Sequence, residues 1–238
     1  MITSENIKKF PHLDKSGLSP RKTRNGPEHE FLQNYLQNYL PSTPKGQELT
    51  IFIEPNVDSV FPDAVAVYWD LNIVKKWNER RLLLSKQDIR LLHYFSLVNT
   101  ASYNTLEKVF SLNLHKSIGR LAEANLIKKN KSDFWSIKPL KNIFAIKRLI
   151  TIEAKISDWQ GGLLQAFFHT WFASESYLLI SKLPKGEQLV DDASRLGIGI
   201  ATNETPLENS LSKARCENIP KSYASWLFNE WAWKTKAN

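Results

Sequence analysis

The spacing of apolar and polar residues divides the chain into short elements that predict a mixed α/β protein. Apolar residues recur at three- and four-residue intervals over residues 28–40, which predicts an amphipathic helix. Two β-rich runs follow at 49–54 and 64–69, and the turn residues between them predict a β-hairpin. After Pro139 the predicted elements are strands at 144–153, 177–180 and 197–201 and helices at 163–172, 189–196 and 211–233, the last of them interrupted by Pro220.

The segment between these two parts has a different pattern. It predicts three helices, at 86–98, 103–110 and 115–125, and then a β-hairpin over 126–137 with a polar tip. This order is typical of a winged helix-turn-helix domain. The phrase Ile-Gly-Arg-Leu-Ala-Glu-Ala-Asn-Leu-Ile at 118–127 resembles the end of a recognition helix that runs into the first wing strand of that family.

The winged-helix resemblance implies a DNA-binding surface. On the predicted recognition helix, Lys116, Ser117 and Arg120 are expected to face the major groove. On the predicted wing, the expected phosphate contacts are Lys128, Lys129 and Lys131. The alternative is an exposed helix face in a winged helix that binds protein.

Charge is distributed unevenly along the chain. The chain has 32 Lys and Arg against 24 Asp and Glu, a net charge of +8, and residues 75–138 contain 13 basic and five acidic residues. The rest of the chain therefore carries no net charge, which favours a polyanionic partner for this one segment. A solvated basic face without a partner is the alternative. Residues 1–27, rich in proline and basic residues and without apolar periodicity, predict a flexible basic arm.

Composition excludes several other classes of protein. Hydrophobic residues make up 42% and charged residues 24%, so the chain as a whole is not disordered. Cys216 is the single cysteine, which excludes a disulfide framework or a cysteine-rich zinc site within one chain. The most apolar stretch, 161–180, is interrupted by polar residues and predicts no membrane span. With no apolar segment at the N-terminus, the expected location is the cytoplasm.

Two short motifs lie at the ends of predicted strands. Pro62-Asp63 opens the strand at 64–69, and Glu153-Ala154-Lys155 closes a β-rich run that a turn and an apolar helix follow. Together they resemble the PD-(D/E)xK nuclease superfamily, whose restriction-endonuclease-like fold is a mixed sheet flanked by helices. The resemblance implies that Asp63 and Glu153 bind Mg²⁺, with Mn²⁺ as a substitute, and that Lys155 orients the attacking water. Alternation along a strand places Glu153 and Lys155 on one face.

Further residues match the superfamily in part. Gln165 corresponds to the glutamine of a Q-x-x-x-Y element, but the fourth residue after it is His169 rather than tyrosine. Relatives often carry another acidic ligand on the first helix, where Glu28 and Glu30 are the candidates and Glu30 is preferred. Glu54, at a strand end, is the third candidate. Each assignment has a structural alternative: Asp63 as a turn residue, Glu153 and Lys155 as a surface ion pair, and Gln165 as a core amide.

Spacing suggests how the two parts are combined. Asp63 and Glu153 are 90 positions apart, and removing residues 75–138 leaves 26, a normal separation for the superfamily. The predicted organisation is therefore a flexible basic arm, a nuclease core in two parts and a winged helix inserted between them, with bounds 1–27, 28–74, 75–138 and 139–238.

These patterns predict a magnesium-dependent endonuclease that hydrolyses phosphodiester bonds in double-stranded DNA. A homodimer is expected if both strands are cut, because each cut needs an active site. The alternatives are a non-catalytic DNA-binding protein on a nuclease-like fold and an RNA-processing nuclease. The DNA sequence recognised and the biological process stay open.

Overall fold

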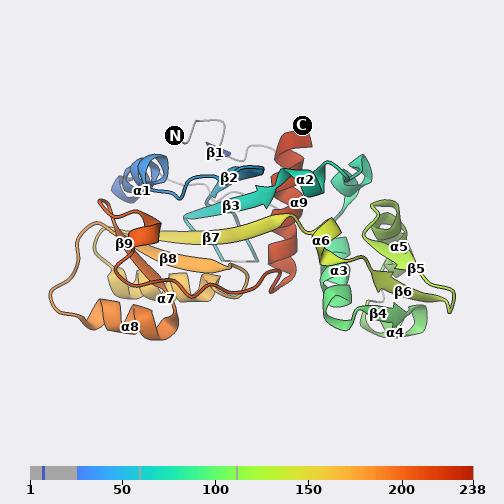
Figure 1. Cartoon of the computed structure of the whole chain (residues 1–238). Helices are drawn as coiled ribbons and strands as arrows, with labels where there is room; N and C mark the ends of the chain where they lie inside the picture. Colours follow the sequence, from blue (N-terminus) through green and yellow to red (C-terminus); the bar gives the residue numbers. More distant parts are fainter. Residues whose placement is uncertain (1–6, 9–25, 59, 111, 238) are drawn as a thin grey trace.

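The computed structural model describes residues 7–8, 26–58, 60–110 and 112–237. Within them, the protein is α/β and has a mixed sheet with the strand order β1-β2-β3-β7-β8-β9 and helices on both faces (Figure 1). The strands of this sheet are β1 (Ile7–Lys8), β2 (Gln47–Ile53), β3 (Ala64–Asp70), β7 (Ile146–Lys155), β8 (Glu175–Ile180) and β9 (Gly199–Thr202).

The connections determine the strand directions. β2, β3 and β7 are antiparallel neighbours, whereas β7, β8 and β9 run parallel. Parallel neighbours need a crossover, and α7 (Trp159–His169) and α8 (Gln188–Leu196) provide the two crossovers. The same end of β7 that precedes α7 carries Glu153 and Lys155.

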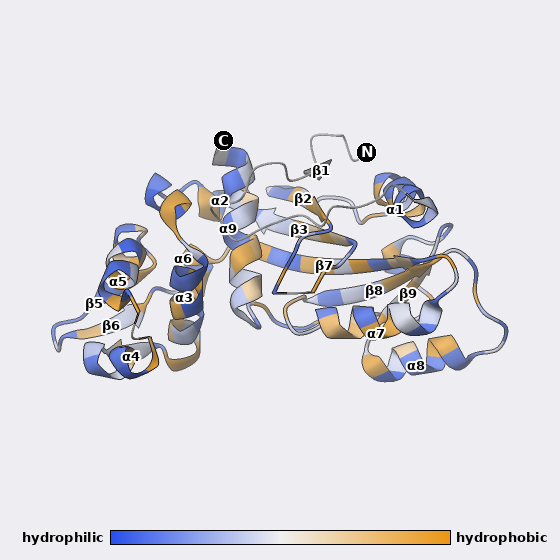
Figure 2. Cartoon of the chain, turned by 180° about the vertical axis from the view of Figure 1, so that it is seen from behind, coloured by the Kyte–Doolittle hydropathy of each residue, from blue (hydrophilic) through white to orange (hydrophobic). Residues whose placement is uncertain are grey.

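Helices bury both faces of the sheet, which explains why its central strands are apolar on both sides. The helix α1 (Pro27–Asn38) packs Leu32 and Leu36 against one face, in a cluster with Ile51 and Ile152. The other face is covered by α7, α8 and α9 (Tyr223–Ala237) (Figure 2). Because α9 is buried along nearly its whole length, it is apolar on several sides, with Trp226 and Trp231 inside the core.

Residues 75–138, here called the insert, lie between two neighbouring strands of the large sheet. The chain leaves β3 and returns at β7, where Trp69 is paired with Ile146 (Figure 1). The insert forms a separate antiparallel sheet of order β4-β6-β5 with three helices. Its elements are η3 (Glu79–Leu83), α3 (Lys86–Val98), β4 (Thr100–Ser102), α4 (Tyr103–Val109), α5 (Leu114–Glu123), β5 (Ile127–Lys129) and β6 (Phe134–Ile137), with α2 (Leu71–Val74) before it and α6 (Leu140–Ile143) after it.

The insert is fixed to the large sheet by a shared core and by a buried ion pair. Leu92 and Phe95 of α3 belong to the same apolar cluster as Trp231 of α9. The Arg81 guanidinium donates to the Glu230 carboxylate, with Nε 2.9 Å from Oε2, and both side chains are buried. The two units are therefore in extensive contact rather than joined by a loose linker.

Most of the longer elements lie where the hydrophobic pattern predicts them. The short elements α2, η3, α6 and η4 (Leu207–Asn209) were not predicted, and two further elements differ. The predicted helix 211–233 is helical only from Tyr223, because 211–222 runs as an irregular segment along β9 and α8. The three-residue strand β4 was not predicted, since so short a segment has no measurable period. The predicted flexible arm at 1–27 lies almost wholly outside the described residues, except that Ile7–Lys8 pairs with β2. In the described residues, no helix is long and apolar enough to cross a membrane.

Candidate active site

Asp63 and Glu153 come together across β3 and β7. Ala64 is paired with Ile152, so one further step of this antiparallel register places Asp63 opposite Glu153 on the same face. The backbone N–H of Ala154 donates to Asp63 Oδ2 at 2.8 Å. The pairing of β3 with β7 thus brings together two carboxylates that lie 90 positions apart in the sequence.

The environment of Glu153 opposes its ionisation. The side chain is only 1% exposed, and its burial together with the Asp63 charge raises the pKa of Glu153 to about 8. Among the described residues, its buried Oε2 has no hydrogen-bond partner. A buried carboxylate oxygen without a donor is rare in a folded protein and is an expected ligand position for a bound cation.

Lys155 lies beside Glu153 because strand alternation brings every second side chain to one face. Its Nζ donates to Glu153 Oε1 at 2.6 Å. Burial tends to lower the pKa of Lys155, but the Glu153 carboxylate outweighs it, and the pKa stays above its ordinary value. Gly162 of α7 provides the space for this lysine: a Cβ there would lie 2.6 Å from Lys155 Cγ.

Of the three additional acidic candidates, Glu28 lies nearest to this group. Its Oε1 accepts a hydrogen bond from the Ile156 backbone N–H at 3.1 Å, and its charge contributes to the raised pKa of Glu153. Glu28 and Glu30 are both exposed, but Glu30, the preferred candidate from the sequence, lies two residues further along α1, and such a step turns by about 200° around a helix. We refer to Glu28, Asp63, Glu153 and Lys155 as the carboxylate cluster.

Glu54 faces His29 rather than the carboxylate cluster. Its Oε1 lies 3.9 Å from His29 Nδ1, and its backbone N–H donates to the Asp63 carbonyl at 2.9 Å. The left-handed backbone of Glu54, with φ of 49°, ends β2 and turns the chain away. Glu54 therefore supports the loop that carries Asp63.

Gln165 and His169 of α7, the two positions compared with the Q-x-x-x-Y element, differ in exposure. Gln165 is exposed, and no hydrogen bond joins it to the carboxylate cluster within the described part of the chain. His169 is 2% exposed, and burial, together with the Lys155 charge, lowers the pKa of His169 to about 3. The residue near the cluster is thus a neutral histidine, which the sequence identified only as a departure from a tyrosine.

The arrangement of carboxylates is relevant to metal binding. Among the described residues, no three His, Cys, Asp or Glu side chains are gathered closely enough to form a metal-binding group. The oxygen donors of Asp63 and Glu153 nevertheless suit a hard divalent cation, and the partnerless Oε2 fits such a ligand. In the described arrangement, the Lys155 ammonium neutralises Glu153 in part.

On α5 of the insert, the predicted DNA-binding residues divide into exposed and engaged side chains. Lys116 is exposed. Ser117 is only 1% exposed, so it does not lie on the outer helix face that the sequence predicted for it. Arg120 forms two hydrogen bonds of 2.7 Å with Asp88 of α3, which ties two helices of the insert together.

The wing lysines differ in the same way. All three are exposed, and Lys129 alone of them forms an ion pair within the described residues, with Asp133 four residues further on. The sequence did not single out Asp88 or Asp133 as partners, although Ser85 and Asp88 have the spacing of a helix capping box.

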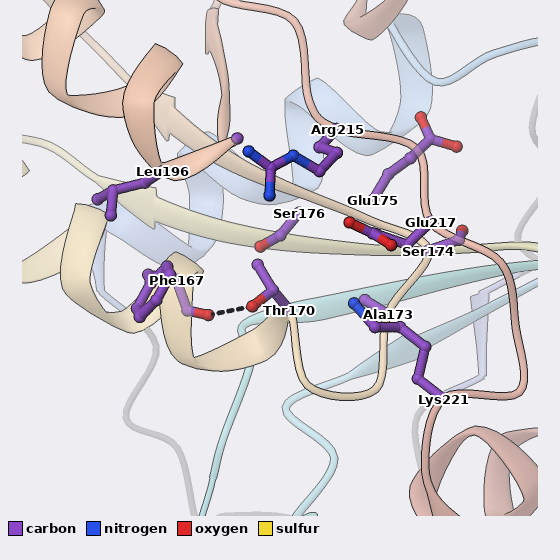
Figure 3. A pocket seen from close by; sticks show the side chains of 11 residues that line it. Phe167, Thr170, Ala173, Ser174, Glu175, Ser176, Leu196, Arg215, Glu217 and Lys221 are labelled. Atoms are coloured by element: carbon purple, nitrogen blue, oxygen red, sulfur yellow. Dashed lines mark hydrogen bonds between the residues drawn. The ribbon is translucent and has the colours of Figure 1, made fainter.

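A separate polar pocket of about 110 Å³ lies near the start of β8, away from the carboxylate cluster (Figure 3). Arg215, Glu217 and Lys221 line it, so its charges are mixed. Glu175, also in its wall, is already bound by Arg148 at 2.7 and 2.8 Å. This pocket therefore does not extend the carboxylate cluster.

Comparisons of the chain with models of protein families, with curated proteins and with solved structures found no match.

Proposed function

We propose that the protein is a metal-dependent deoxyribonuclease of the PD-(D/E)xK type. The observation that carries this proposal is the opposed pair Asp63 and Glu153 on adjacent strands, with a buried Glu153 oxygen that has no donor in the described structure. Like charges placed opposite each other destabilise a sheet, so such a pair needs a counter-charge. Lys155 supplies part of it, and a divalent cation would supply the rest.

The order of elements supports the assignment. Helix α1, the antiparallel strands β2, β3 and β7, the helix α7 and the parallel strand β8 follow one another as the resemblance implies for a restriction-endonuclease-like core. The element order α3-β4-α4-α5-β5-β6 and the sheet order β4-β6-β5 of the insert support its assignment as a winged helix. Both fold assignments belong to the proposal.

Each member of the carboxylate cluster has a role in this proposal. Asp63 and Glu153 would hold the cation, and Glu28 lies close enough to add a charge at the same strand end. A bound Mg²⁺ polarises the phosphate and lowers the pKa of its water. The Lys155 ammonium, held beside Glu153, would orient that water and stabilise negative charge on the phosphate.

The free charges of the insert support a DNA partner. Five of its basic residues form ion pairs: Arg81, Lys86, Arg90, Arg120 and Lys129. The other basic residues of the insert form no ion pair within the described part of the chain. They are Lys75, Lys76, Arg80, Lys108, Lys116, Lys128, Lys131 and Lys138. Since the phosphate backbone dominates nucleic-acid affinity, the free lysines of α5 and the wing, Lys116, Lys128 and Lys131, are the expected docking contacts. A homodimer remains part of the proposal for cutting both strands.

A cleavage assay tests this function. Plasmid and duplex oligonucleotides are incubated with wild type in EDTA, Mg²⁺ or Mn²⁺, and with Glu153→Gln, Lys155→Ala and the matched control Glu30→Gln. We expect cleavage only with the metals, a loss of more than about a hundredfold in the first two variants and full activity in the control. Metal-independent or unchanged cleavage in Glu153→Gln would refute the site. Binding without cleavage would favour a DNA-binding protein, and cleavage of RNA alone an RNA-processing enzyme.

A further inference from the structure

A second cavity lies where the insert joins the large sheet. Its volume is about 300 Å³, and its walls come from three places: the start of the insert (Lys76, Trp77, Arg81), the later part of the insert (Asn125, Lys138) and the chain leaving it (Asn142). We call it the seam cavity. Lys76 and Asn125 are exposed, so it opens to solvent.

The seam cavity is positively charged. Three of the described lining residues are cationic and none is a carboxylate. Arg81 is neutralised by Glu230 and lies 3.3 Å over the Trp77 ring, so it shapes the wall. Lys138 donates to the neutral Asn125 amide, and Lys76 has no ion-pair partner among the described residues, so both retain an uncompensated charge. An anion is the complementary ligand.

The walls of the seam cavity are held in place. Trp77 Nε1 donates to the Asn142 carbonyl at 2.9 Å, and Arg81 donates to the Ile143 carbonyl at 3.0 Å. On the exit side, the Ala145 N–H donates to Asn229 of α9 at 2.7 Å. The cavity therefore keeps a fixed position relative to β7.

That position sets a distance to the carboxylate cluster. Asn142 and Ile143 of α6 line the seam cavity, and α6 leads directly into β7 (Figure 1). The far end of β7 carries Glu153 and Lys155. Ten residues of strand span about 30 Å. Since phosphates follow one another every 3.4 Å along each strand of a duplex, about nine nucleotides cover this distance.

We propose that the seam cavity binds a backbone phosphate of duplex DNA, at least about nine nucleotides from the phosphate that is cut. The phosphate that is cut depends on the proposed nuclease function. The phosphate in the seam cavity is inferred from that cavity alone. Lys76 and Lys138 provide the charge, and the Asn142 side chain lies in the same wall.

The test compares Lys76→Glu with Lys108→Glu. Lys108 is an exposed lysine of the same insert, on α4, and has no ion pair in the described structure, so the reversal changes the net charge equally. Both are made in the full chain carrying Glu153→Gln, so that binding is measured without cleavage. Two sets of duplexes, one shorter and one longer than the span of about nine base pairs that separates the seam cavity from the carboxylate cluster, are titrated at several salt concentrations.

On long duplexes, we expect Lys76→Glu to bind at least about tenfold more weakly and to flatten the salt slope by about one unit, the contribution of one phosphate. Lys108→Glu should change neither by as much, and on short duplexes the two variants should bind alike. Equal effects of both variants at every length would overturn the proposal. Cleavage by the otherwise wild-type chain is measured in parallel: if it is absent while the length effect persists, the nuclease function fails and the phosphate site stands.

Discussion

Asp88 in the insert and Glu153 in β7 are both buried carboxylates, but the groups around them differ in charge and in hydrogen-bonding capacity. Asp88 accepts from the Arg120 guanidinium, the Ser85 backbone and the Ser85 hydroxyl. These donors overcome burial and hold the pKa of Asp88 below its ordinary value. Within the described residues, Glu153 has one donor, Lys155, and its burial together with the charge of a second carboxylate raises its pKa to about 8.

The difference indicates two uses of a buried charge. A carboxylate whose oxygens are all engaged fixes the packing of neighbouring helices, as Asp88 does for α3 and α5. A carboxylate with an unengaged oxygen costs stability, and such a cost is tolerated where a ligand will bind. On this comparison, Asp88 is the structural carboxylate, and Glu153 is the one that we propose as functional.

The largest expected effect distinguishes the two carboxylates by stability. Asp88→Asn keeps the volume but loses the ionic bonds to Arg120, and we expect it to destabilise the fold by about 2 kcal/mol, since Arg120 stays partly solvated. This corresponds to a melting temperature about 5 °C lower. Glu153→Gln, which removes a repulsion, should melt at or above the wild-type temperature at pH 8. Calorimetry of both variants measures this, and a large destabilisation in Glu153→Gln would contradict the comparison.

The next effect concerns which acidic side chain of α1 belongs to the carboxylate cluster. Both side chains are exposed, but Glu28 accepts from the Ile156 N–H and raises the pKa of Glu153, and Glu30 is not among the groups that shift this pKa. We expect Glu28→Gln to lower Mg²⁺-dependent cleavage about ten- to a hundredfold, as outer ligands of metal sites commonly do. Glu30→Gln should cleave as wild type. Initial rates at several Mg²⁺ concentrations separate weaker metal affinity from a slower step, and the reverse order would restore Glu30 as the ligand.

A smaller effect is the pH dependence of stability. The raised pKa of Glu153 means that the folded protein keeps a proton which the unfolded chain has released, so stability falls as the pH rises from about 4.5 to about 8. For Asp88 the lowered pKa gives the opposite sign: its contribution is present near neutral pH and is lost as the pH falls below about 4.

Melting temperatures measured between pH 5 and pH 8 test the Glu153 contribution, because Asp88 stays ionised there. The fall with pH should be weaker in Glu153→Gln than in wild type by a few degrees. Added Mg²⁺ should stabilise wild type more at pH 8 than at pH 5, since it requires the ionised carboxylate. An identical pH profile in the two proteins would show that Glu153 titrates normally.

The sequence was a good guide to the carboxylate cluster where local period and chain order were sufficient. Strand alternation predicted that Glu153 and Lys155 share a face, and their 2.6 Å hydrogen bond agrees with it. The removal of residues 75–138 from the spacing predicted that Asp63 and Glu153 are neighbours, and the register of β3 and β7 places them opposite each other. Both inferences needed only the two-residue period and the order of strands.

Other features depended on tertiary contacts that no local pattern encodes. The choice between Glu28 and Glu30 depends on how α1 is rotated on the sheet, which Leu32 and Leu36 set through their burial. The sequence predicted that Ser117 and Arg120 lie on the outer face of the recognition helix, but the packing of α5 on α3 brings them to Asp88. The spacing of Ser85 and Asp88 in the sequence indicated a capping box, but no local pattern indicated that Arg120 would contact Asp88.

The smallest expected effect repeats the comparison of engaged and free charges on the wing. Lys129 is already paired with Asp133, whereas Lys128 and Lys131 are exposed without an ion pair in the described structure. We therefore expect Lys128→Ala with Lys131→Ala to weaken binding to every duplex several-fold and to flatten the salt slope by up to about two units. Lys129→Ala alone should change the slope by clearly less than one unit, because forming a phosphate contact there would first break an existing pair. Titrations on random duplexes at several salt concentrations give both slopes. If Lys129→Ala alone matched the double variant, the ion pair to Asp133 would not restrain that side chain in solution, and engaged and free lysines on this surface would be equivalent.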